Sequence, residues 1–192
     1  MTQQVADEVL GKIARQQNDL FRRVREGTLS PGFVSLGLQD LIEGRFANNG
    51  VSYVVNVNYD LSLKKAVKAG KYDWTDSNIS SKNFPSKRKG AADVEVIFVH
   101  FDRDITSNEI IRELDSQGLR PVELPELLAF GAKFPEIQRK FPVVALGSVW
   151  QRPSGSCHCA FLDVGSADKR GLFLRRFDDE WSRRCRFAVV RK

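Results

Sequence analysis

The stretch GLFLRRFDDEWSRRCRFAVVRK, Gly171 to Lys192, decides how the fold of this chain is interpreted. Large apolar residues interrupt its charges at short intervals: Leu172, Leu174, Phe177, Trp181, Phe187, Val189 and Val190. A solvated tail would lack the aromatic residues, and a core strand would lack the charges. The mixture predicts a surface held in place by buried anchors, which we expect to be Phe177, Trp181 and Phe187.

The polar residues between these anchors are expected to face solvent. They are Arg175, Arg176, Asp178, Asp179, Ser182, Arg183, Arg184 and Cys185. Arginine and tryptophan are enriched where proteins recognise partners, so residues 175–185 are a candidate ligand-binding site. The alternative is an exposed hairpin that closes an ordinary domain, since most protein surfaces are charged.

Upstream of this stretch, strand and helix patterns follow one another. Period-two alternation or apolar runs predict strands at 51–59, 94–101, 143–150, 160–164 and 186–191. The capping-box sequence Thr106-Ser107-Asn108-Glu109 predicts a helix that Gly118 ends, and Pro125 starts another. A short helix is expected from Ser62 to Ala69, closed by Gly70. Residues 47–192 are therefore predicted to form one α+β domain.

The N-terminal residues 1–46 are predicted to form a helical hairpin. Apolar residues fall near one face of the segment 4–26, and Gly27 is a plausible end. Ser30-Pro31 starts a second helix that ends near Gly44. Two interpretations stay open: the apolar stripes cover one side of the domain, or the pair is an oligomerisation arm.

Composition is typical of a folded globular protein, with 192 residues, 42% of them hydrophobic and 28% charged. The N-terminus has no apolar core like that of a signal peptide, and no stretch approaches the ~20 apolar residues of a membrane span. The expected localisation is cytoplasmic as encoded. The three cysteines form an odd count and predict no disulfide framework.

The basic character of the chain suggests a second function. Its net charge is +6, and the polar loop 75–92 contains Lys82, Lys87, Arg88 and Lys89. Such a run could contact phosphates, although charges in a loop are more often simply solvated. The alternative function is therefore a nucleic-acid-associated accessory protein of a phage or mobile element.

The sequence contains only weak signals for metal binding or catalysis. Cys157-His158-Cys159 lacks the usual spacing of zinc ligands, and an extended strand would point His158 away from both thiols. We expect two buried thiols, a surface imidazole and no metal. The acids Asp178-Asp179-Glu180 are expected to pair with nearby arginines. Without a nucleotide, zinc-protease or serine-hydrolase motif, the sequence predicts neither an enzyme nor a cofactor.

The order of elements over residues 93–192 resembles the C-type lectin-like fold in its bacterial form, as in formylglycine-generating-enzyme-like domains. In that family a helix precedes a "G-x-R-L-P-T-x-x-E" segment, and a "GFR(L/V)" strand ends the chain. The counterparts here are Gly118, Arg120, Pro121, Glu126, Arg186, Phe187 and Val189. The usual Leu-Pro-Thr is not intact, and no glycine precedes Phe187. The resemblance implies a C-type lectin-like domain behind the N-terminal helical pair.

Within that fold, the chain is similar to variable proteins of diversity-generating retroelements and to proteins of candidate-phylum bacteria. In the former, copying errors at adenines diversify solvent-facing residues of the last segment, while fixed aromatic residues hold the backbone. Variable positions there use NNY codons, which exclude Lys, Glu, Gln, Met and Trp. The candidate site residues are all permitted, whereas Glu180 and Trp181 would be fixed. The resemblance implies that residues 175–185 present a diversified surface to a macromolecular ligand.

Overall fold

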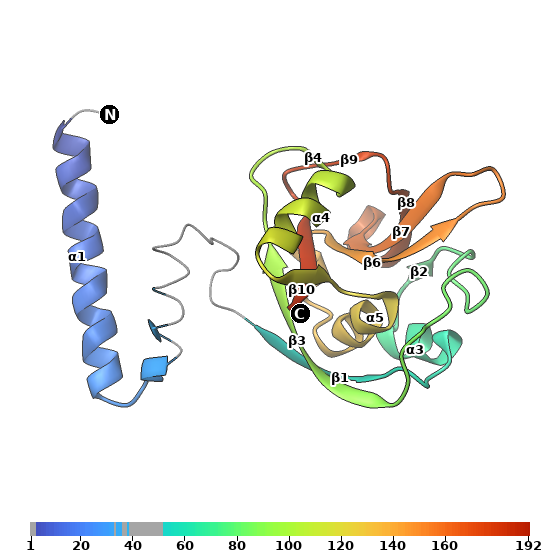
Figure 1. Ribbon diagram of the computed structural model, residues 1–192, viewed down its shortest axis with the longest axis horizontal. Coiled ribbons are helices and arrows are strands. Elements are labelled where there is room, and N and C mark those ends of the chain that lie inside the picture. Colours follow the sequence, from blue (N-terminus) through green and yellow to red (C-terminus); the bar gives the residue numbers. More distant parts are fainter. Residues whose placement is uncertain (1–2, 33, 36–37, 39–51) are drawn as a thin grey trace. The chain divides into compact units, whose positions relative to one another are not determined.

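The computed structural model describes residues 3–32, 34–35, 38 and 52–192 (Figure 1). The chain divides into two compact units, Met1–Phe46 and Ala47–Lys192. In the first unit, α1 runs from Gln3 to Arg25, and Gly27 follows it with a φ of 72°. The second helix predicted there, from Ser30 to Gly44, falls mostly outside the described residues.

The second unit alternates strands and helices along the chain. Its elements are β1 (Tyr53–Asn58), α3 (Leu63–Gly70), β2 (Trp74–Thr75), β3 (Ala91–Val99), β4 (Ile105–Thr106), α4 (Ser107–Ser116), β5 (Leu119–Pro121), α5 (Leu124–Lys133), η1 (Ile137–Arg139), β6 (Val143–Gln151), β7 (Cys157–Val164), η2 (Ser166–Asp168), β8 (Arg170–Arg176), β9 (Glu180–Trp181) and β10 (Arg186–Arg191). The unit is an α+β structure, as the sequence predicted.

One mixed sheet organises this unit. Its strands lie in the order β1-β3-β10-β6-β7-β8-β2, and β5 pairs with the end of β10. Most pairs are antiparallel, but β6 with β10 and β2 with β8 are parallel. The last strand in sequence, β10, therefore lies in the middle of the sheet. A separate small ribbon joins β4 to β9.

Side chains of alternate strand residues enter two cores, one on each face of the sheet. On one face, Ala188 and Val190 of β10 pack with α3 and α5. On the other, Phe187 and Val189 pack with α4 and the β4–β9 ribbon. In Figure 1, α3 and α5 accordingly lie together, whereas α4 lies beside β4. Because both faces of β10 are covered, its sequence is an almost continuous run of apolar residues.

The helix starts follow local sequence rules. Thr106 caps α4 as predicted: its Oγ1 accepts a hydrogen bond from the Glu109 N–H, and the Glu109 carboxylate accepts one from the Thr106 N–H. Glu123 and Glu126 form a similar capping box at α5, a helix that also contains Pro125 in its first turn. Two fixed helix starts thus orient one helix on each face of the sheet.

Helix α1 is amphipathic, with exposed apolar side chains. Leu10, Ile13 and Phe21 are 61%, 51% and 43% exposed. This pattern fits the oligomerisation arm as well as the alternative interpretation, in which the stripe covers a domain. The oligomeric role of this helix stays a prediction.

Candidate functional site

The C-terminal segment is built around Trp181. This side chain is 1% exposed, and its Nε1–H donates a 2.8 Å hydrogen bond to Ser107 Oγ. The Ser107 hydroxyl in turn donates to the carbonyl oxygen of Phe177, at 2.6 Å. Trp181 also makes edge contacts with the rings of Phe161 and Phe187. The start of α4 therefore fixes the segment through a buried tryptophan.

The three predicted anchors differ in burial. Trp181 and Phe187 are buried, at 1% and 2% exposure, as expected. Phe177 is only half-buried: it lies in the turn between β8 and β9 and packs against the core that contains Trp181 without being enclosed by it. Its backbone still holds the segment, since the Phe177 N–H donates to the carbonyl oxygen of Cys157 at 2.8 Å.

Most of the predicted recognition residues do reach solvent. Exposed side chains belong to Arg175, Arg176, Asp178, Ser182, Arg183 and Arg184, and Asp179 is half-buried. The Arg183 backbone is fixed, because its N–H donates to Asp104 Oδ1 at 3.0 Å and its carbonyl accepts from His100 Nε2 at 2.7 Å. The loop thus combines a restrained backbone with free side chains at its tip.

Cys185 corrects the expectation of a solvent-facing site residue. Its side chain is 5% exposed and belongs to the second core, beneath the loop. The thiol lies 3.8 Å from Ser182 Oγ, and burial is the largest cause that raises its pKa. Cys185 therefore supports the loop from below and does not line the surface.

Arg175 and Arg176 lie at the end of β8, where the sequence did not predict a strand. Both guanidinium groups approach Asp179, at 3.8 and 3.9 Å, as expected for ion-paired acids. Arg175 also donates to the carbonyl oxygen of Glu180 at 2.9 Å and lies over the Trp181 ring. Arg175 is therefore a fixed edge of the site, whereas Arg176 extends from the strand end.

The Cys157-His158-Cys159 triplet is part of β7. Neighbouring residues point to opposite faces of the sheet, as predicted, but the expected surface imidazole is wrong, because His158 is 6% exposed. Of the two thiols expected to be buried, Cys159 is buried and Cys157 is only half-buried. Its ring lies 6.0 Å from that of Trp150. Burial raises the pKa of Cys159 to about 12, so this thiol stays protonated at neutral pH and is a poor nucleophile.

A row of aromatic rings borders the predicted site, and sequence reasoning missed it. Phe161 of β7 stacks on Phe173 of β8, with ring centroids 5.4 Å apart, and Phe173 stacks on Trp74 of β2 at 4.8 Å. The row continues from the buried rings of Trp181 and Phe187. Trp74, at its other end, is 49% exposed. One sheet face thus changes from covered core to open surface along this row.

Backbone pairing holds the outer ring of the row in place. Strand β2 pairs in parallel with β8, and Trp74 lies opposite Gly171. The Asp73 N–H donates to the Arg170 carbonyl oxygen at 2.8 Å. A Cβ atom on Gly171 would lie 2.2 Å from the Phe173 ring, so glycine is what lets that ring lie flat against the strand. The ring stack is therefore a built feature of the sheet.

Charged groups surround the row on the same face. Asp163 and Phe161 are both odd-numbered residues of β7, and Arg175 of β8 lies opposite Cys159. The Asp163 carboxyl is half-buried, and burial raises its pKa while the nearby Arg184 charge lowers it. Arg175 and Asp163 both interact electrostatically with the Cys185 thiol. Arg175 therefore lies on the same sheet face as the rings, whereas Arg176, opposite His158, lies on the other face.

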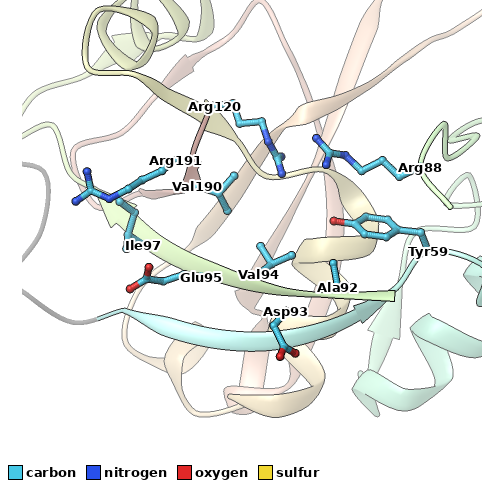
Figure 2. A pocket seen from close by; sticks show the side chains of 10 residues that line it. All are labelled: Tyr59, Arg88, Ala92, Asp93, Val94, Glu95, Ile97, Arg120, Val190 and Arg191. Carbon is cyan, nitrogen blue, oxygen red and sulfur yellow. The ribbon is translucent and has the colours of Figure 1, made fainter. Parts of the chain in front are cut away.

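A separate hollow lies where β3 and β10 diverge (Figure 2). The two strands pair only at Ile97–Val99, and beyond that point a cavity of about 280 Å³ opens between them. In Figure 2, Arg88 and Arg120 point toward one another across this hollow, whereas Asp93 points away from it. Each arginine is held by a carboxylate: Arg88 by Glu123 at 2.9 Å and Arg120 by Glu126 at 2.7 Å. This compensation argues for a structural role.

Glu126 is the buried centre of that ion-pair cluster. Its carboxylate, with 0% exposure, accepts hydrogen bonds from Tyr59 Oη, two nitrogens of Arg120 and the Glu123 N–H. Burial alone would raise the pKa of Glu126, but these donors outweigh burial and hold the pKa below its usual value. The Tyr59 hydroxyl, buried and bonded to the same carboxylate, has a pKa raised to about 12.

This pKa shift predicts acid sensitivity. Because the folded-state pKa of Glu126 is lowered, its contribution to stability is present above the unfolded-state pKa of about 4.3 and is lost as pH falls through the folded-state value. We expect the free energy of unfolding to decrease below about pH 5. Urea denaturation at several pH values measures this. Glu126→Gln should show a shallower acid dependence, and an identical slope in the two proteins would contradict the assignment.

Among the described side chains, no group of three or more His, Cys, Asp or Glu could hold a metal ion. None of the helices described is both long enough and apolar enough to span a membrane. Comparison of the chain with known protein families, curated proteins and solved structures found no match.

Proposed function

We propose that residues 47–192 form a C-type lectin-like scaffold whose C-terminal surface recognises a macromolecular ligand. The surface comprises the exposed side chains of Arg176, Asp178, Ser182, Arg183 and Arg184, bordered by Arg175. The observation that carries the proposal is the contrast within one loop: its polar side chains are exposed, while Trp181 beneath them is buried. Recognition surfaces that tolerate sequence change need this separation between supporting and contacting residues.

The order of elements supports the scaffold. Strand β3 is followed by the capped helix α4, the segment that contains α5, the strand β6 with Trp150, the anchored stretch and the terminal strand β10. This is the order on which the resemblance to the C-type lectin-like fold rests. The same resemblance supports diversification by a retroelement, and a near-repeat of the DNA encoding residues 171–192 beside a reverse transcriptase gene would be its signature.

A display library tests whether the surface can carry binding specificity. Codons of NNY type would replace Arg176, Asp178, Ser182, Arg183 and Arg184, and clones would be assayed for thermal stability and for binding to immobilised proteins. Exposed positions away from special contacts usually change stability by less than about 0.5 kcal/mol each, so most clones should fold. Selection should then enrich clones that bind one target and not another.

A matched control library keeps this test falsifiable. It would vary Trp181, Cys185 and Phe187, which are all buried, with the same number of clones screened. We expect this library to yield few folded clones, because large-to-small changes in a packed core are costly. Equal folded fractions in the two libraries, or folded clones of the first that bind no target, would refute the proposed recognition surface.

The alternative function is a basic nucleic-acid-associated protein. Net charge alone favours it weakly. The specific observation in its favour is the aromatic row of Trp74, Phe173 and Phe161 on the sheet face that also carries the exposed Arg175.

A further inference from the structure

The aromatic row ends in an incomplete ring stack. Trp74 lies nearly parallel to Phe173, at an interplanar angle of 25° and a centroid distance of 4.8 Å. One face of the indole is thus covered by Phe173, while 49% of the residue is exposed. The opposite face of the indole is therefore where a further planar ring can continue the stack. Offset stacking of this kind stabilises an aromatic pair beyond the area that it buries.

The backbone that carries this ring is held in place before any ligand arrives. Trp74 is flanked by two backbone hydrogen bonds to β8, from the Asp73 N–H to the Arg170 carbonyl oxygen at 2.8 Å and from the Asp76 N–H to the Leu172 carbonyl oxygen at 3.0 Å. Asp73 also accepts from the Arg170 N–H at 2.8 Å. A preorganised ring loses little conformational entropy when a ligand stacks on it.

Cationic side chains border the row on the side of the C-terminal loop. Arg184 directly precedes Cys185, whose side chain packs in the same core as Phe161 and Trp181, and the Arg184 charge also lowers the pKa of the Asp163 carboxyl on that face. Arg183 and Arg184 are both exposed. A planar stack flanked by exposed arginines fits a ligand with planar rings joined by anionic links. That combination is the chemistry of single-stranded nucleic acid, whose bases stack on aromatic side chains while basic groups contact the phosphates.

We propose that the ligand of this surface is single-stranded nucleic acid, with one base stacked on Trp74 and phosphates contacted by Arg183 and Arg184. The inference rests on the proposed recognition function of the same surface and names its ligand class. A duplex is a poorer ligand, because its bases are already stacked on one another. Stacking depends little on base identity, so we expect weak sequence preference.

The test uses the full chain and a fluorescein-labelled oligothymidylate of about twelve nucleotides, within the site sizes typical of such proteins. Fluorescence anisotropy at low salt should show binding, and the dissociation constant of a duplex of equal length should be higher. Trp74→Ala should weaken single-strand binding about tenfold or more, and Trp74→Phe should restore most of it. Trp150→Phe, on the opposite face of the sheet, is the matched control and should bind like the wild type.

Salt dependence tests the phosphate contacts separately. The logarithm of the binding constant should fall linearly with that of the salt concentration, by about 0.7 per phosphate contact for a single strand. Substituting Arg183→Ser and Arg184→Ser together should make this slope shallower. Binding that is unchanged by both the Trp74 and the arginine substitutions would place the nucleic acid elsewhere and overturn this inference.

The outcomes separate failure of the ligand class from failure of the recognition surface. Absence of oligonucleotide binding at low salt overturns the nucleic-acid assignment alone. A random-peptide phage library that enriches on the wild type, but not on the Arg183/Arg184 variant, would then keep the recognition surface with a protein ligand. No enrichment on either protein, combined with no oligonucleotide binding, would count against both proposals.

Discussion

Replacing Trp181 with alanine should destabilise the second unit by roughly 3–5 kcal/mol, the usual cost of removing a large buried aromatic side chain. The indole is 1% exposed, joins the rings of Phe161 and Phe187, and donates a hydrogen bond to Ser107. Since domains are stable by about 5–15 kcal/mol, much of the total would be lost. The melting temperature of a domain of this size should fall by about 10 °C or more.

Two further variants show what part of this loss comes from packing. Trp181→Phe keeps an aromatic ring but removes the Nε1–H, so it should lose less stability than alanine. By contrast, Arg176 is an exposed residue at the end of β8. The substitution Arg176→Ser should change the free energy of unfolding by less than about 0.5 kcal/mol. Urea denaturation gives all three values. A silent Trp181→Ala with a damaging Arg176→Ser would mean that surface ion pairs hold this segment, and the recognition proposal would lose its basis.

The second large effect is expected at Glu126. Glu126→Ala would leave a partly buried Arg120 guanidinium and the Tyr59 hydroxyl without their shared carboxylate. Removing one partner of a buried ion pair typically costs about 3–5 kcal/mol, because the remaining charge is uncompensated. The wall of the β3–β10 hollow should loosen as well. Urea denaturation measures the loss of stability, and hydrogen exchange at β5 and α5 should report the local opening.

Glu123 provides the matched control for that experiment. It pairs with Arg88 in the same hollow, but the two side chains are 24% and 43% exposed. Exposed ion pairs contribute at most about 1 kcal/mol, so Glu123→Gln should be mild. Because Glu126→Gln keeps an acceptor for Tyr59, its effect should fall between those of Glu123→Gln and Glu126→Ala. Equal losses at Glu123 and Glu126 would contradict the central role of the buried carboxylate.

Local patterns predicted the secondary structure well where the signal lies within a few residues. The capping box at Thr106–Glu109, the strand that became β1 and the terminal strand β10 are such cases. Hydrogen bonds between residues three apart, or a period of two, leave direct marks in sequence. The burial of Trp181 and Phe187 followed from the same reasoning, because large aromatic residues among charges seldom lie free in solvent.

Features that depend on long-range pairing were not predictable in this way. The parallel pairing of β2 with β8 brings Trp74 next to Phe173, although the sequence between them contains most of the domain. His158 was expected at the surface because it is polar, whereas its burial beside Trp150 is set by tertiary packing. The burial of Cys185 was not predicted, for a related reason: the conformation of the turn before β10 decides which of its side chains faces inward.

The central place of β10 has a consequence for the order in which the protein can fold during synthesis. During synthesis, all the other strands described in this unit leave the ribosome before residues 186–191. Strands β3 and β6 therefore emerge without β10, the strand that lies between them in the sheet. Until that strand arrives, both have open edges and uncovered apolar faces, which are the features that promote aggregation and chaperone binding. A nascent chain that stalls before β10 would hold two unjoined sheet halves. Premature termination just before codon 186 should therefore yield insoluble product and not a shortened binding domain.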